Sequence, residues 1–194
     1  MVMNRLDGLE VLVPTDTGVL EAWLEGHHAT ASGVWLMLAK KGSGVTSMTS
    51  EEVIDVALCF GWIDGQRRAY DAVHFLQKIT PRRPRSLWSL VNVRKVDALT
   101  AAGRMREPGL AEVRAAQEDG RWAAAYPSQK EATVPPDLEA ALAASPEARD
   151  FYDSLGKTDR YLVILRLVTA RTAENRAERL TRMVAKLAAG QKIS

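Results

Sequence analysis

The sequence predicts an α+β protein, with a small, mostly antiparallel sheet and packed helices followed by a C-terminal helical bundle domain. Two observations predict this class. Short apolar runs bounded by turn residues occur only before residue 81, where capped helical segments separate them, and the chain beyond residue 136 shows helical periodicity alone. We therefore expect an α+β domain over 1–125, a linker with three prolines over 126–136, and a small helical domain over 137–194.

The first elements of the α+β domain are expected to be a strand, a helix and a second strand. LEVLVP at 9–14 is a short apolar run that ends in proline, which favours a strand. Residues 16–28 carry leucines and a tryptophan at helical spacing. GVWLMLA at 33–39 is apolar throughout, as is typical of a strand buried on both faces.

A helix is predicted over MTSEEVIDVALCFG, because Thr49 and Glu52 form a capping box and Gly61 stands where the helix should end. WIDGQRRAY at 62–70 and HFLQKIT at 74–80 then predict two strands joined by a tight connection.

Two helices are expected to complete this domain, and three or four to build the next one. Ser86 is placed to cap a helix over 87–103, and a second helix is expected over 109–117. The C-terminal helices are expected within 136–144, 145–155, 159–170 and 174–190. The last is amphipathic, with an apolar stripe and arginines roughly opposite it.

Cysteine, histidine and hydropathy usage exclude several classes. Cys59 is the only cysteine, so the chain can form neither an intramolecular disulfide nor a cysteine-based zinc site. The three histidines lack a metal-ligand spacing, and we expect no metal and no cofactor. No stretch approaches the roughly 18 apolar residues of a membrane helix, and the N-terminus lacks an export signal. We expect a cytoplasmic protein without a transmembrane segment.

A basic segment is the strongest functional signal. Between Gln66 and Lys95 there are eight basic residues and one acid, Asp71, which gives this segment a net charge of +7 within a chain of net charge +2. Guanidinium groups bind phosphate and carboxylate bidentately, and aromatic residues between them would stack on bases. The candidate polyanion contacts are Arg67, Arg68, Lys78, Arg82, Arg83, Arg85, Arg94 and Lys95. The alternative is that these side chains only solvate an edge strand and a loop.

A pocket is the second possibility. Asp64 stands beside arginines and would act as a base or as an anchor for a guanidinium, while Cys59 and His74 would form a nucleophile–base pair if the fold joined them. The residues considered for such a pocket are Trp62, Asp64, Tyr70, His74 and Trp88. The tryptophans are more typical of a core, and no catalytic residue is assigned.

Several longer strings resemble a known family. They are ALCFGWIDGQRR (57–68), FLQKITPRRPRSLWSLVNVRKVDAL (75–99), AAGRM (101–105), DGRWAAAY (119–126) and the helical piece from 138 to 190. Together they resemble the bacterial YdeI/OmpD-associated proteins, also labelled bacteriocin-protection proteins. The resemblance implies a role in tolerance of bacteriocins or cationic antimicrobial peptides, and an association with an outer-membrane porin. It implies no catalytic residue.

Three functional hypotheses remain open at this point. The first is a binding protein whose basic surface at 67–95 engages nucleic acid or another polyanion. The second is the stress-resistance role that the resemblance implies, exercised through a protein partner. The third is an enzyme that uses Asp64 and neighbouring arginines on an anionic small molecule. The sequence does not indicate an oligomeric state.

Overall fold

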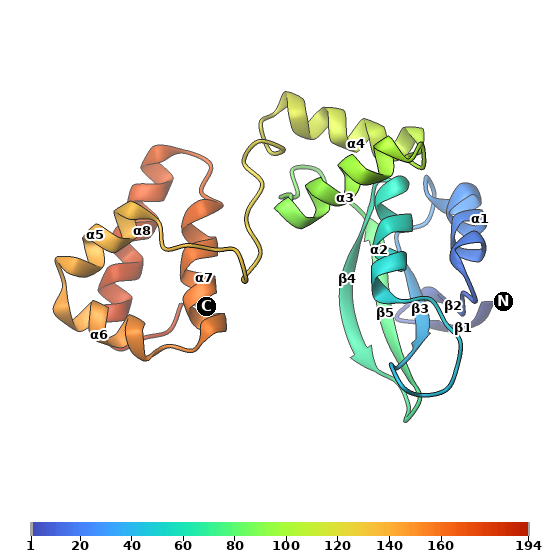
Figure 1. The fold of residues 1–194 in the computed structure, drawn as a ribbon, viewed down its shortest axis with the longest axis horizontal. Helices are drawn as coiled ribbons and strands as arrows, with labels where there is room; N and C mark the ends of the chain where they lie inside the picture. The colour runs from blue at the N-terminus through green and yellow to red at the C-terminus, as the bar shows by residue number, and fades with distance from the viewer. Residues whose placement is uncertain (1, 194) are drawn as a thin grey trace. The chain divides into compact units, whose positions relative to one another are not determined.

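A computed structural model of the chain describes residues 2–193. These residues form two compact units (Figure 1). The first unit runs to Ser86 and resumes over Asn92–Ala123, and the second comprises Leu87–Val91 and the chain from Ala124 onward. The first holds all the strands described and the second adds helices, which confirms the predicted α+β class.

A five-stranded sheet forms the centre of the first unit, in the order β1-β2-β3-β5-β4. Among the strands of this sheet within residues 2–193, only β2 and β3 pair in parallel, so the expectation of a mostly antiparallel sheet is confirmed. The strands are β1 (Val2–Leu6), β2 (Leu9–Leu12), β3 (Val34–Ala39), β4 (Trp62–Ala69) and β5 (His74–Pro81). Strand β1 was not predicted. It forms a hairpin with β2 through a two-residue turn in which Asp7 and Gly8 both have positive φ.

The sheet is strongly curled. Arg68 of β4 forms an ion pair of 3.2 Å with Asp7 of the β1–β2 turn, although β1 and β4 are opposite edges of the sheet. In a flat sheet, four strand spacings would hold these edges roughly 19 Å apart. Beneath the approaching edges lies a buried cluster made of Val11, Trp35, Met37 and Leu76. The curl therefore encloses a second small core.

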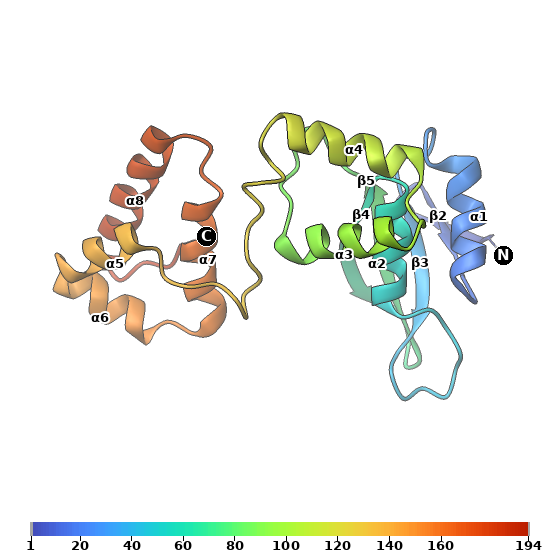
Figure 2. The same cartoon turned by 45° about the horizontal axis from the view of Figure 1, so that its top comes forward.

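Helices cover the other face of the sheet and form the larger core of the first unit with it (Figures 1 and 2). They are α1 (Thr17–His27), α2 (Ser50–Cys59), α3 (Leu90–Ala101) and α4 (Glu107–Glu118). Helix α2 packs against β4, α1 and α4. It begins with the predicted capping box, in which Thr49 accepts a hydrogen bond from the Glu52 amide and the Glu52 carboxylate accepts one from the Thr49 amide. The predicted start of this helix is confirmed.

Helix α3 begins later than expected, at Leu90 instead of directly after Ser86. The preceding residues pair with Tyr126. Its amide donates to the Trp88 carbonyl at 3.0 Å, and its own carbonyl accepts from the Leu90 amide at 2.8 Å. The Trp88 ring is buried. A backbone pairing with a residue far along the chain has thus replaced the first turn of the predicted helix.

The second unit contains the expected C-terminal helices, α5 (Pro136–Ala143), α6 (Pro146–Ser154), α7 (Lys157–Val168) and α8 (Ala173–Ala188). Their shared core includes Leu138, Val163, Leu167 and Leu187, all fully buried. A bidentate ion pair also ties α8 to α5, because Arg176 donates to both carboxylate oxygens of Asp137 at 2.7 and 2.9 Å. Within residues 2–193, none of the helices has the length and apolar character needed to cross a membrane.

Candidate functional site

The basic residues of β4 point to opposite faces of the sheet, as successive residues of a strand must. Arg67 lies on the helix-covered face. Its guanidinium stands 4.6 Å from the centre of the Phe75 ring and donates to the Gln77 side-chain oxygen at 3.0 Å and to the Ser50 hydroxyl. Arg68 lies on the other face, over the ring of Trp35. The two neighbouring arginines therefore present their charges to different surfaces.

Lys78 of β5 lies with Arg68 on the face of the sheet that encloses the Trp35 cluster. Each cation stands 5.8 Å from the centre of the Trp35 ring, which is itself fully buried. Cation–π contacts of this kind hold a positive charge above an apolar core. Asp7 balances the charge of Arg68, while no ion pair involves Lys78 among residues 2–193.

Neither Lys95 nor Arg82 offers a positive charge that a polyanion could contact. Lys95 forms ion pairs with Asp55 at 2.7 Å and Glu51 at 3.1 Å. Burial alone would lower the pKa of Lys95, but hydrogen bonds to these two carboxylates raise it, so the lysine stays charged and balanced. Arg82 is only 6% exposed, and its inclusion among the surface contacts is corrected, because a polymer cannot reach a guanidinium enclosed by the fold.

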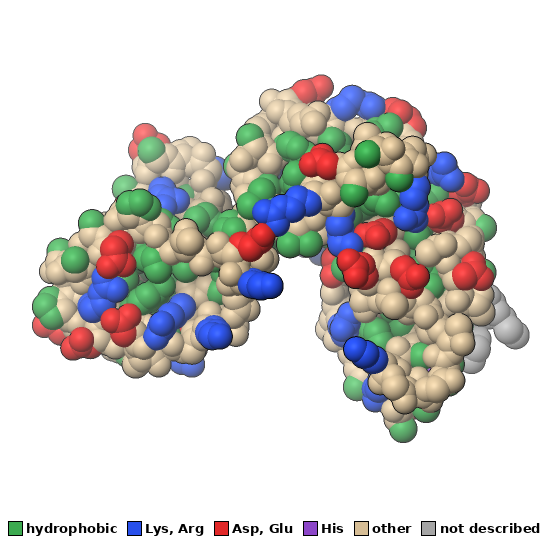
Figure 3. Space-filling model, viewed as in Figure 1, with side chains coloured by type: hydrophobic (Ala, Val, Ile, Leu, Met, Phe, Trp, Pro, Cys, Tyr) green, Lys and Arg blue, Asp and Glu red, His purple; other side chains and the backbone are tan. Residues whose placement is uncertain are grey.

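The loop after β5 carries two exposed arginines. Arg83 and Arg85 are exposed between and beside prolines, and a turn closed by the Ser86 amide on the Arg83 carbonyl shapes the loop. Arg85 has a φ of 63°, which is unusual for a residue other than glycine. Arg94 is exposed on α3. Within residues 2–193, neither Arg83 nor Arg85 forms an ion pair. On the face seen in Figure 3, basic and acidic side chains of the sheet-containing unit lie interspersed.

The pocket proposed around Asp64 does not form, and that prediction is wrong. Asp64 pairs with Ile79 across the β4–β5 ladder, whereas His74 begins β5 five residues away, about 17 Å along the strand. His74 instead contacts Asp71 of the hairpin turn at 3.0 Å. Tyr70 is 57% exposed beside that turn. The fold therefore holds the members of the proposed pocket apart.

The remaining pocket candidates are structural. The Trp62 ring is buried and donates from Nε1 to the His28 carbonyl at 3.2 Å, and Trp88 belongs to the second unit. Cys59 lies buried at the end of α2, close to the end of β5 at Pro81. His74 stands at the other end of that strand. Burial raises the pKa of the Cys59 thiol, which disfavours the reactive thiolate. A Cys59–His74 pair is thus excluded by position.

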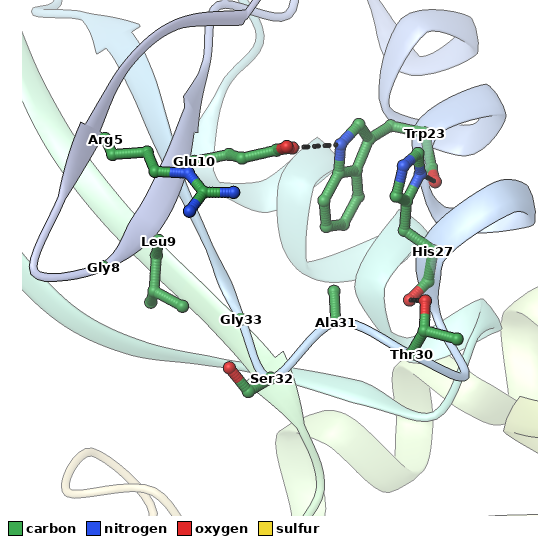
Figure 4. Close-up of a pocket in the computed structure, with 10 residues that line it drawn as sticks. All are labelled: Arg5, Gly8, Leu9, Glu10, Trp23, His27, Thr30, Ala31, Ser32 and Gly33. Carbon is green, nitrogen blue, oxygen red and sulfur yellow. Dashed lines mark hydrogen bonds between the residues drawn. The ribbon is translucent and has the colours of Figure 1, made fainter.

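A different hollow, of about 300 Å³, lies between the β1–β2 hairpin, α1 and the loop before β3 (Figure 4). Trp23 of α1 is one of the side chains that line it. The indole Nε1 donates to the Glu10 carboxylate at 3.1 Å, and the His27 ring stacks on the indole with centroids 4.6 Å apart. Arg5 stands opposite Glu10 in the β1–β2 register. The hollow therefore brings together a carboxylate, an imidazole and a guanidinium.

The imidazole of His27 has a defined tautomer when neutral. Its Nδ1 lies 2.7 Å from the Trp23 carbonyl, which can only accept, so Nδ1 carries the proton and Nε2 keeps its lone pair. Sequence analysis missed this hollow. The only sequence signal was the four-residue spacing of Trp23 and His27 on one helix face, and the strand that brings Arg5 beside them was not predicted. In the described part of the chain, no cluster of three or more His, Cys, Asp or Glu is arranged to hold a metal ion.

Comparisons with known proteins divide the chain in two. Residues 12–112 match a family model described as a domain of unknown function (DUF8412). Residues 131–190 match OmdA, described as bacteriocin-protection, YdeI or OmpD-associated, which confirms the predicted resemblance. The GWIDG and TPRRPRS strings, on which that resemblance also rested, lie inside the DUF8412 match. No curated protein and no solved structure matches the chain.

Proposed function

The chain belongs to the DUF8412 family and carries an OmdA domain, and we propose on that premise that it is a binding protein that contributes to bacteriocin tolerance. Its ligand in this proposal is nucleic acid or a similar polyanion, contacted by the β4–β5 hairpin and the loop that follows it. One observation carries the proposal. Four cations there, Arg67, Lys78, Arg83 and Arg85, form no ion pair with any carboxylate of residues 2–193.

The cations of the β4–β5 hairpin lie on different faces of the sheet, and the position of β4 bears on whether one ligand can contact them. Strand β4 is an edge of the sheet and is exposed from Asp64 to Ala69, so a flexible polymer can run along it. Tyr70, exposed at the end of the same hairpin, offers a ring on which an unpaired base can stack. Single-stranded nucleic acid is therefore the polyanion that this geometry favours.

Binding across a salt series tests the proposal. The protein is titrated against mixed-sequence single- and double-stranded oligonucleotides, and fluorescence anisotropy reports the affinity. The double substitution R83A/R85A is expected to weaken binding at least tenfold at low salt. It should also reduce the slope of log K against log salt by about 1.4 for single strands and about 1.8 for duplexes, because two phosphate contacts are lost.

A matched control separates specific contacts from net charge. The double substitution R104A/R106A removes the same charge, but these arginines face Glu21 and Glu25 at 3.4 and 3.9 Å. It should leave the affinity within about twofold. Equal weakening by both double substitutions, or no binding by the unaltered protein at low salt, would contradict the proposal.

Bacteriocin tolerance needs a cellular test. A deletion strain is complemented with the unaltered gene, with R83A/R85A or with R104A/R106A, and its killing by bacteriocins and cationic peptides is measured. We expect the unaltered gene and the control to restore tolerance and R83A/R85A to fail. A deletion strain with unchanged sensitivity would refute the role in tolerance while leaving the binding measurements standing.

A further inference from the structure

The second unit contains a cavity of about 600 Å³ where α7 ends and α8 begins. Six of its seven lining residues are polar, namely three arginines and three neutral residues whose side chains can form hydrogen bonds. They are Arg166, Thr169, Arg171, Thr172, Asn175 and Arg179, together with Leu87 of the same unit.

The arginines come from three consecutive segments. Arg166 lies in the last turn of α7, Arg171 in the connection, and Arg179 in the second turn of α8. Arg179 is held toward the cavity, because its Nη1 donates to the Arg166 carbonyl at 2.8 Å. The connection itself is fixed by Thr172, which caps α8 by accepting a hydrogen bond from the Asn175 amide. The positions of these charges are thus built into the helix junction.

No carboxylate balances this group of charges. Within residues 2–193, no ion pair involves Arg166, Arg171 or Arg179, and no acidic residue lines the cavity. The carboxylates of the adjoining helix starts do not pair with these three arginines. Asp137 is bound by Arg176, and Glu174 accepts hydrogen bonds from its own amide and from the Thr172 hydroxyl, which lower its pKa. The positive charges of Arg166, Arg171 and Arg179 add at this junction and attract anions to it.

We propose that this cavity binds a phosphorylated small molecule. Guanidinium groups match the oxygens of a phosphate monoester in charge and geometry, and the positive end of the α8 dipole, at the same junction, adds to the attraction. The volume lies within the 300–1,000 Å³ typical of small-molecule sites and far exceeds what a lone phosphate ion needs. Leu87, 41% exposed, supplies an apolar wall for the organic part of the ligand.

Calorimetric titration of the full chain tests this site. The probes are inorganic phosphate, pyrophosphate, adenosine monophosphate and glucose 6-phosphate, with adenosine and glucose as uncharged counterparts. We expect at least one organic phosphate to bind more tightly than inorganic phosphate, and neither uncharged counterpart to bind. Failure of all four phosphate compounds to bind at millimolar concentration would overturn the proposal.

Three variants locate the binding. R171Q and R179Q are each expected to weaken binding of the best probe at least tenfold. R182Q, which removes the same charge from the next turn of α8, should leave it within twofold, since Arg182 donates to the Glu178 carbonyl and does not line the cavity. Should R179Q unfold the unit, R171Q still decides, because Arg171 lies in the exposed connection. Equal effects of all three variants would also overturn the proposal.

A further variant distinguishes this cavity from Arg83 and Arg85 of the loop after β5. R83A/R85A is expected to bind the phosphate probe normally while losing affinity for oligonucleotides. Loss of the small-molecule probe in R83A/R85A, with R171Q unaffected, would place the phosphate compound at the loop after β5 and refute the cavity assignment. The two proposals can therefore fail separately.

Discussion

Replacing Gly109 with alanine should destabilise the first unit, although alanine is the better helix former. Gly109 is buried in the first turns of α4, where that helix crosses the end of α2. A Cβ atom built on Gly109 would stand 2.3 Å from the Cys59 carbonyl oxygen and 2.7 Å from that of Leu58. Both contacts are shorter than real Cβ atoms show, so one of the helices must move.

Movement is costly here because both carbonyls are already in use. The Cys59 oxygen accepts from the Arg106 amide at 3.1 Å, and the Leu58 oxygen accepts from the Gly61 amide at 3.1 Å. Overpacking in a rigid core costs about 1–3 kcal/mol, and the obstacle here is backbone, which places the cost at the upper end. The helix propensity of alanine returns at most about 1 kcal/mol. We expect a net loss of roughly 2 kcal/mol in the free energy of unfolding.

Urea unfolding followed by tryptophan fluorescence measures this loss. Four of the five tryptophans, Trp23, Trp35, Trp62 and Trp122, belong to the first unit, so the signal reports mainly on it. With a denaturant slope of about 2 kcal/mol per molar, the midpoint should fall by about 1 M. The same exchange at Gly26, in α1, is the control, since a Cβ there has no neighbour within 4 Å. It should raise stability by about 0.5 kcal/mol. A Gly109→Ala midpoint equal to or above that of the unaltered protein would refute the argument from the crossing.

Three further predictions concern a cap, a titration and a thiol. Thr49→Ala should cost about 1 kcal/mol in urea unfolding by removing the capping box of α2, and Thr49→Ser should restore most of it. Hydrogen bonding to Arg176 lowers the pKa of Asp137 below its usual 3.8, so this carboxylate contributes stability that is present above that pH and lost as pH falls through the lowered value. Asp137→Asn should therefore flatten the acid side of the stability–pH curve, and an unchanged curve would contradict it. Cys59 is buried, and burial raises the pKa of its thiol. Its reaction with a thiol reagent at pH 8 should therefore be at least a hundredfold slower in the native protein than in urea. Comparable rates would refute its burial.

Elements with strong local signals could be predicted from the sequence. The capping box specified the start of α2, because both its hydrogen bonds join residues three positions apart. The apolar run of β3 reflected burial on both faces, one under the helices and one in the curled cluster. Strand β1 was missed, since its short mixed run forms a strand only by pairing with β2. The start of α3 was misplaced for a similar reason, because Tyr126 pairs with the residues before it.

The candidate sites depended much more on contacts between distant residues. The sequence showed where basic residues concentrate, but Lys95 is balanced by Glu51 and Asp55, about 40 positions away, and Arg68 by Asp7, 61 positions away. The Arg166–Arg179 cavity likewise required α7 and α8 to fold back on each other.

The sequence by itself determined the α+β class, the capped helices and the segment in which positive charge accumulates, because composition, periodicity and caps act over a few residues. Only the tertiary structure decided which of those charges remain unbalanced, that Asp64 and His74 lie apart, and that arginines gather at the α7–α8 junction. Coulomb interactions and burial act through space, and distance in space is set by strand register and helix packing, which no local pattern records.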